Sequence, residues 1–338
     1  MRPLALDTAV VTEPFFIGQT DLDDVVDVPL VTLIRMAHPA STYVISITPF
    51  SEDGAFDEDA FRAHLRRMAA GGVGVYVGGG GSGEGYTLDE DETRRVVEIA
   101  VDELRGKVPV RAMGVEPRLA ADMIRYITMA DSLGVDACQV YSLDQGHGHR
   151  PNEAEIEAYF TDILSAVNSP CVLSTHQSVG YQVRVPLLKK LVEQFDHVIG
   201  INSSHQDHGY LARIIDAVGD RVTVHVGGPA HGLLNLSLGG QGFLTSEANL
   251  APALCASVTK AYDAGDISTM MTSFGKVVRL SDTLYRNGGI RVTKAVLDHL
   301  GLPGGYPRKP QLPVSGEVLA TVAAAVEALE IPELAGSA

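Results

Sequence analysis

The sequence predicts an α/β chain folded as a TIM (β/α)8 barrel with a C-terminal helical extension, and three observations support this prediction. The 338 residues, of which 45% are hydrophobic, suffice for one large core. Between residues 42 and 265, eight short runs rich in Val and Ile alternate with stretches of helical period. These runs carry few alternating polar residues, as expected for parallel strands covered on both faces. Eight strand–helix units are the content of a TIM barrel.

The elements follow in order along the chain. Residues 1–41 do not fit the alternation, and we assign them to an N-terminal extension. The barrel is assigned to residues 42–265. Its strands are expected at Tyr43–Thr48, Val73–Gly78, Val108–Met113, Ala137–Tyr141, Cys171–Ser174, Val198–Asn202, Val222–Val226 and Gly242–Thr245. Two of the intervening helices are marked by apolar stripes: Phe61, Leu65 and Met68 in one, and Ile156, Phe160, Ile163, Leu164 and Val167 in the other.

Residues 266–338 form the predicted helical extension, which a barrel does not itself require. Helices are expected at Asp266–Leu284, Ile290–Leu300 and Ser315–Leu329. Ser315 precedes an apolar stripe and is the expected N-cap of the last helix.

Composition narrows the classes of partner and location. The net charge of −16 argues against nucleic acid, because a phosphate backbone would be repelled over most of the surface. No apolar run reaches the roughly 18 residues of a membrane span, and the N-terminus lacks the apolar core of a signal peptide. The three cysteines are far apart, which supports neither a disulfide framework nor a thiolate zinc cluster. We therefore expect a soluble cytoplasmic protein.

A TIM barrel places its active site at the carboxyl ends of the strands. The polar residues expected there are Thr48, Gly79–Glu84, Glu116, Asp144–His149, Ser174–Gln177, Asn202–His208, Gly227–His231 and Ser246–Asn249.

Four stretches in register resemble the dihydrodipicolinate synthase / N-acetylneuraminate lyase family. They are Ile47-Thr48-Pro49-Phe50, the Gly80-Gly81-Ser82-Gly83-Glu84 loop, the run from Gly240 to Asn249, and Val292-Thr293-Lys294-Ala295 with Leu300-Gly301-Leu302. The resemblance implies a TIM barrel with a helical extension and a homo-oligomer, commonly a tetramer or else a dimer. It also implies lyase or aldolase chemistry on 2-oxo acids through a lysine–pyruvate imine. We take Thr48, Gly81, Ser82, Gly83 and Asp144 as the substrate-binding candidates, and the resemblance implies that Glu84 braces its loop.

The sequence departs from the family pattern at the positions of the family's catalytic residues. Asn202 stands where the resemblance places the imine lysine, and Ser174 where it places the proton-relaying tyrosine. Val179 falls near the carboxylate-binding arginine, and Gly81-Ser82 replaces a threonine pair. An asparagine amide is not nucleophilic, because its nitrogen lone pair is delocalised into the carbonyl. The lysines of the chain all fall in expected helices or loops away from the strand ends: Lys107, Lys189, Lys190, Lys260, Lys276, Lys294 and Lys309. The sequence therefore predicts no Schiff base.

Other polar groups stand at the same strand ends. Ser174 and His176 share one face of a strand, so both are expected to point inward. We take His176, Asn202, Ser174, His205 and Glu247 as the catalytic candidates. Arg111 is expected either to face the barrel interior and bind an anion or to form a structural salt bridge.

Two mechanisms fit these candidates. In the first, histidines together with Glu247 or Glu116 hold a divalent metal that polarises a substrate carbonyl. In the second, which needs no metal, His176 or His205 is the general base while Asn202, Ser82 and backbone amides stabilise an enolate. The sequence does not decide between these two mechanisms, so the cofactor is unknown. The Gly78–Gly83 run matches the family's carboxylate loop, so a nucleotide phosphate site is not expected.

Three functional hypotheses remain. The first is a lysine-independent lyase, hydratase or aldolase that acts on an oxo acid or keto-sugar. The second is a non-catalytic barrel that binds a small molecule or regulates a partner. The third is an ordinary imine aldolase whose lysine comes from an unexpected position, including a neighbouring subunit.

Overall fold

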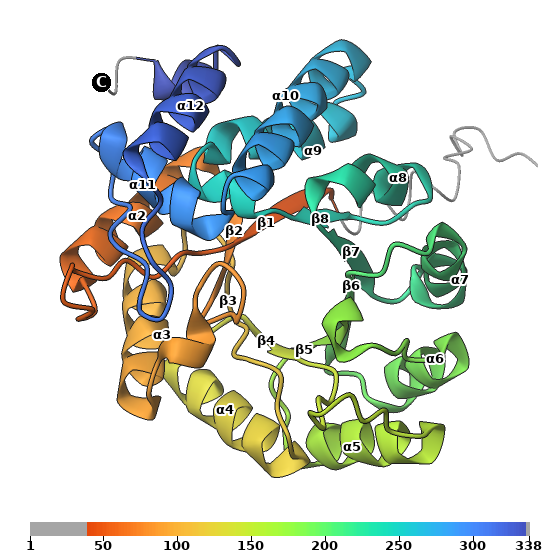
Figure 1. The fold of residues 1–338 in the computed structure, drawn as a ribbon. Helices are drawn as coiled ribbons and strands as arrows, with labels where there is room; N and C mark the ends of the chain where they lie inside the picture. The colour runs from red at the N-terminus through yellow and green to blue at the C-terminus, as the bar shows by residue number, and fades with distance from the viewer. Residues whose placement is uncertain (1–38, 336–338) are drawn as a thin grey trace, which may run out of the picture.

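Eight parallel strands close into a barrel in the order β1 to β8, as the sequence predicts. The computed structural model describes residues 39–335 and is shown in Figure 1. The strands are β1 (Ser41–Ile45), β2 (Gly74–Val77), β3 (Val110–Ala112), β4 (Ala137–Val140), β5 (Cys171–Thr175), β6 (Val198–Ser203), β7 (Thr223–Gly227) and β8 (Gly242–Leu244). Ser41 of β1 pairs with Gly242 of β8, and this contact completes the closure.

Helices surround the barrel, as Figure 1 shows. They are α2 (Glu58–Gly71), α3 (Glu90–Leu104), α4 (Ala120–Leu133), α5 (Glu153–Ala166), α6 (Val185–Gln194), α7 (His208–Val218), α8 (Gly232–Ser237) and α9 (Pro252–Asp263). Asp89 and Glu92 form a capping box at the start of α3, and Asn152 and Glu155 form one at the start of α5. The two predicted apolar stripes are buried on α2 and α5.

Three further helices follow the barrel: α10 (Ile267–Arg286), α11 (Ile290–His299) and α12 (Gly316–Glu327). The Ser315 side chain accepts a hydrogen bond from the Val318 amide at 3.3 Å, which confirms the expected N-cap. Residues 1–38 of the expected N-terminal extension, and residues 336–338, lie outside the described residues. The division at residues 41 and 265 stays a prediction, although β1 already begins at Ser41. None of the helices between residues 39 and 335 has the length and apolarity to cross a bilayer.

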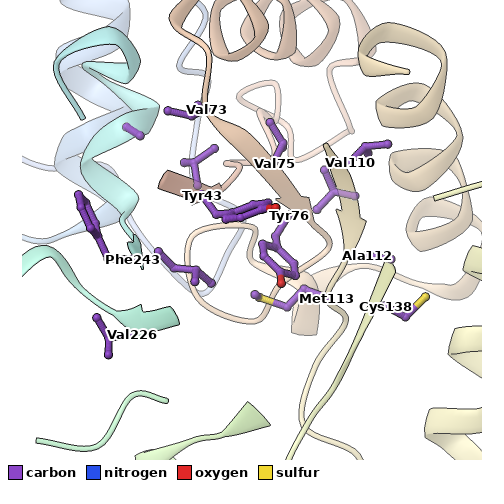
Figure 2. Packing of buried hydrophobic residues seen from close by; sticks show 14 of the residues in the cluster. Tyr43, Val73, Val75, Tyr76, Val110, Ala112, Met113, Cys138, Val226 and Phe243 are labelled. Carbon is purple, nitrogen blue, oxygen red and sulfur yellow. The ribbon is translucent and has the colours of Figure 1, made fainter. Parts of the chain in front are cut away.

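The barrel interior is partly polar, which the Val- and Ile-rich strands do not predict. The rings of Tyr43 and Tyr76 lie 5.4 Å apart inside the barrel (Figure 2). The guanidinium of Arg111 lies 4.3 Å from the centre of the Tyr43 ring, and His225 packs edge-on against the same ring. Side chains from neighbouring strands of a TIM barrel fill its interior, so these four lie in the packed core between the strands.

Candidate functional site

A cavity of about 320 Å³ opens at the carboxyl ends of the strands. Residues that end or follow all eight strands line it: Ile45, Gly81, Ser82, Met113, Gln139, Tyr141, Ser174, His176, Gln177, Asn202, Ser203, Ser204, Gly227, Gly228, Leu244, Thr245, Ser246 and Glu247, with Tyr285 from α10. A more open groove of about 610 Å³ lies between α6 and α7, but it is lined by residues of these helices and of the segment before α6, away from the strand ends. We take the cavity at the strand ends as the candidate site because convergent polar groups meet there.

Ser174 and His176 both line this cavity, as their shared strand face predicts. His176 Nδ1 contacts Ser178 Oγ closely and lies 3.4 Å from Glu116 Oε1. Its Nε2 forms no hydrogen bond with residues 39–335. Burial lowers the pKa of His176, and Glu116 opposes that shift. A carboxylate behind one ring nitrogen orients the imidazole and leaves the other nitrogen available to a ligand.

Asn202 is the second-last residue of β6 and is almost fully buried against the barrel interior. Its Nδ2 donates to Gln139 Oε1 at 2.6 Å and to Tyr76 Oη at 3.2 Å. Its Oδ1 is buried and has no hydrogen-bond partner among the described residues. The amide is thus held by two neighbours and keeps one unpaired polar atom beside the cavity.

Glu247 follows β8 and is fully buried. One carboxylate oxygen accepts a short hydrogen bond from Thr245 Oγ1, whereas Oε1 has no partner in the described chain. A buried carboxylate oxygen without a partner is costly unless a ligand or a proton satisfies it. Glu247 therefore offers the cavity a hydrogen-bond acceptor.

Four predicted site residues do not line the cavity. Thr48 Oγ1 donates to the Gly83 carbonyl at 2.8 Å, so these two brace each other. A Cβ at Gly83 would lie 2.8 Å from the Gly79 carbonyl, which fits a packing role. Asp144 pairs with Arg118 at 3.2 Å and accepts from the Gly146 amide.

The fourth, His205, packs edge-on against Tyr210, and its Nε2 is buried without a partner in residues 39–335. Burial and the nearby His176 lower its pKa. The loop that contains His147 and His149 is exposed to solvent.

None of the seven lysines of this chain lines the cavity. Lys294 is fully buried, but its Nζ contacts Glu84 Oε2 and donates to the carbonyls of Thr48 and Tyr306 at 2.8 and 3.0 Å. The other Glu84 oxygen accepts from the Arg308 amide. The lysine ammonium is therefore occupied by the brace that holds the Gly80–Glu84 loop, the role expected for Glu84.

The group of metal ligands that the first mechanism requires is not formed by the described residues. Within residues 39–335, no three His, Cys, Asp or Glu side chains are arranged so that they could hold a metal ion. His176 and Glu116 are close to each other, but Glu247 and the exposed loop histidines do not join them in such a group.

Several groups that shape the site are not predicted from the sequence. Gln139 and Tyr76 hold the Asn202 amide, Tyr141 packs edge-on against His176, and Tyr285 enters from α10. A signal existed for Gln139, which is a lone amide in the apolar run from Ala137 to Val140. Successive side chains on a strand point to opposite faces, so Tyr76 could have been assigned to the face opposite that of Val75 and Val77.

The fold and the cavity define the class first: a TIM barrel whose small-molecule site lies at the strand ends. Comparison with known proteins then narrows it. The model of the dihydrodipicolinate synthetase family matches residues 39–329. The chain therefore belongs to this family and is a lyase or aldolase-like enzyme.

Relatives agree with the family match. The 4-hydroxy-tetrahydrodipicolinate synthase of Phenylobacterium zucineum is 32% identical over 285 residues, which cover 83% of this chain and 94% of the relative. The enzyme of that name from Methanopyrus kandleri is 30% identical over 266 residues, with coverage of 78% and 87%. A prophage protein of the dihydrodipicolinic acid synthase family from E. coli K12, solved with pyruvate, superposes with a TM-score of 0.79 at 23% identity. The superposition covers 86% of this chain and 99% of that one, and it shows a shared fold.

Proposed function

We propose that this protein cleaves or forms a bond next to the carbonyl of a small oxo acid or keto-sugar without a lysine imine. The observation that carries the proposal is the cavity lining, in which Asn202 stands next to the end of β6 and, among residues 39–335, no lysine is present. An imine requires a primary amine that can reach the substrate carbonyl. The one fully buried lysine, Lys294, has its ammonium bound to Glu84 and to two backbone carbonyls.

His176 is the proposed general base. In aldol cleavage, Nε2 takes the proton of the substrate hydroxyl, and the O–H electron pair forms a new carbonyl. The carbon–carbon bond breaks, and its electron pair moves onto the original carbonyl to give an enolate. Ser82, amides of the Gly-rich loop and an Asn202 amide turned so that its Nδ2 faces the substrate stabilise the enolate oxygen, and His176 returns the proton to carbon. Ser174 and Glu247 bind substrate hydroxyl groups beside them.

Borohydride trapping with pyruvate tests the missing imine. Intact-mass measurement is expected to find no adduct on this protein, while a lysine-containing family member run in parallel is modified. The Asn202→Lys variant is expected to gain an adduct, since it restores an amine at the end of β6. A reduced adduct on any lysine of the unaltered protein would overturn the proposal.

An activity assay tests the general base. Release of pyruvate from a 4-hydroxy-2-oxo acid is expected to fall about 10²–10⁴-fold in His176→Asn, the usual contribution of a general base. Treatment with a chelator is expected to leave the activity unchanged, and a loss on chelation would favour the metal mechanism instead. His149→Asn, in the exposed loop, is the matched control.

The non-catalytic hypothesis has one observation in its favour: the cavity holds an amide in place of an amine. It predicts that pyruvate or a keto-sugar binds but is not turned over, even at high enzyme concentration. Homo-oligomer formation and a cytoplasmic location stay predictions, and light scattering of the purified protein measures the first.

A further inference from the structure

Beneath the cavity, a row of hydrogen bonds leads from a buried cation to Asn202. Arg111 Nη1 donates to Tyr76 Oη at 3.0 Å, and Tyr76 Oη lies 3.2 Å from Asn202 Nδ2. Gln139 lies on the other side of the Asn202 amide at 2.6 Å. The row joins β3, β2, β6 and β4 through side chains alone.

The donors and acceptors along this row do not balance. Tyr76 Oη receives two N–H groups, and its own hydrogen has no acceptor among residues 39–335. At the same time Asn202 Oδ1 is buried with no partner in that range. A phenol has one donor hydrogen, and an amide oxygen accepts up to two hydrogen bonds. Leaving a buried donor and a buried acceptor unpaired is costly.

A half-turn of both amide planes pairs the Tyr76 hydrogen and the Asn202 oxygen without moving any other group. The Tyr76 hydroxyl then donates to Asn202 Oδ1, and Gln139 Nε2 donates to the same oxygen. Asn202 Nδ2 takes the place of the unpaired oxygen and is then the one group of this amide without a partner among residues 39–335, in a residue that lines the cavity. We propose that Tyr76 and Arg111 are positioning residues that hold the Asn202 amide so that its Nδ2 donates to the substrate carbonyl oxygen.

Arg111 supplies a positive charge at one end of this row of hydrogen bonds. The guanidinium forms no ion pair with any residue from 39 to 335, and it packs on the aromatic face of Tyr43. A cation that donates to a hydroxyl makes that hydroxyl a stronger donor, and the effect passes along a buried row. The Asn202 N–H is therefore strengthened at the point where negative charge develops on the substrate. This inference rests on the proposed function, because it concerns carbonyl polarisation in the same cavity.

Infrared difference spectra with [2-¹³C]pyruvate measure the polarisation directly. The bound carbonyl stretch is expected at lower frequency than in water, and the lowering is expected to shrink in Tyr76→Phe and in Arg111→Lys. In turnover, Tyr76→Phe is expected to lower kcat about tenfold with little change in KM, as for residues that orient a group from behind. Tyr43→Phe is the matched control, because its hydroxyl lies outside the row while its ring also packs on Arg111.

The outcomes separate the two proposals. Equal carbonyl frequencies in the unaltered protein and in Tyr76→Phe would overturn the positioning role of Tyr76 and Arg111. They would not contradict the proposal of an enzyme that works without a lysine imine. If pyruvate fails to bind, the proposed substrate class is wrong. A neutron structure of the unliganded protein then tests whether Tyr76 and Arg111 hold the Asn202 amide as proposed. The expected position of the Tyr76 hydroxyl hydrogen is between Oη and Asn202 Oδ1. A hydrogen that points elsewhere would overturn the inference.

Discussion

Two buried carboxylates near the strand ends, Glu84 and Glu247, have very different surroundings. Both are fully buried. Glu84 binds the Lys294 ammonium with one oxygen and accepts the Arg308 amide with the other. Glu247 has a hydroxyl on one oxygen and nothing on the other in the described chain. The first arrangement balances charge and hydrogen bonds, as a structural brace must, whereas the second leaves an acceptor for something absent from the protein itself.

The largest expected effect comes from breaking the brace. Lys294→Met leaves the Glu84 carboxylate buried without its cation, and we expect a loss of about 3–5 kcal/mol in the free energy of unfolding. Urea denaturation followed by circular dichroism measures it. Lys189→Met, which removes an exposed lysine 3.9 Å from Glu193, is the control and is expected to change stability little. A loss below about 1 kcal/mol in Lys294→Met would mean that the pair is not a brace.

Glu247→Gln is expected to behave in the opposite way. The amide keeps the shape and removes a buried carboxyl group that has no cationic partner among residues 39–335, so stability should stay equal or rise. Substrate binding and turnover should fall, and we expect a loss of about 10- to 100-fold in kcat/KM because one hydrogen-bonded group in a buried site is lost. The contrast between Glu84 and Glu247 would be wrong if Glu247→Gln unfolds the protein while the activity per folded molecule is unchanged.

The smallest expected effect concerns Glu116 and the pH profile. Glu116 raises the pKa of His176, although burial lowers it by more. Glu116→Gln removes the raising influence, so the pKa of His176 should fall. A general base works in its neutral form, so the acid limb of kcat/KM should move to lower pH. Asp144→Asn, outside the cavity, is the control, and a shift toward higher pH would contradict the assigned pairing.

Much of the fold was accessible from the sequence. All eight strands and the three C-terminal helices occur where they are predicted, because Val- and Ile-rich runs and apolar stripes report burial directly. Strand parity also placed Ser174 and His176 on the cavity side. The row from Arg111 to Asn202 was not accessible, because it depends on how far side chains from four strands reach across the barrel. For the same reason Thr48 and Gly83, predicted to bind substrate, contact each other instead.

The three helices after the barrel are more than an attachment. Lys294 comes from α11 and Arg308 from the segment after it, and both contact Glu84. Tyr285 of α10 forms part of the cavity wall and lies 2.9 Å from Ser246. A shortened protein that ends near residue 265 would retain every strand, but the wall of the cavity at the strand ends would be altered. An engineered protein that reuses the eight-stranded barrel as a catalyst would therefore need to include these three helices as well.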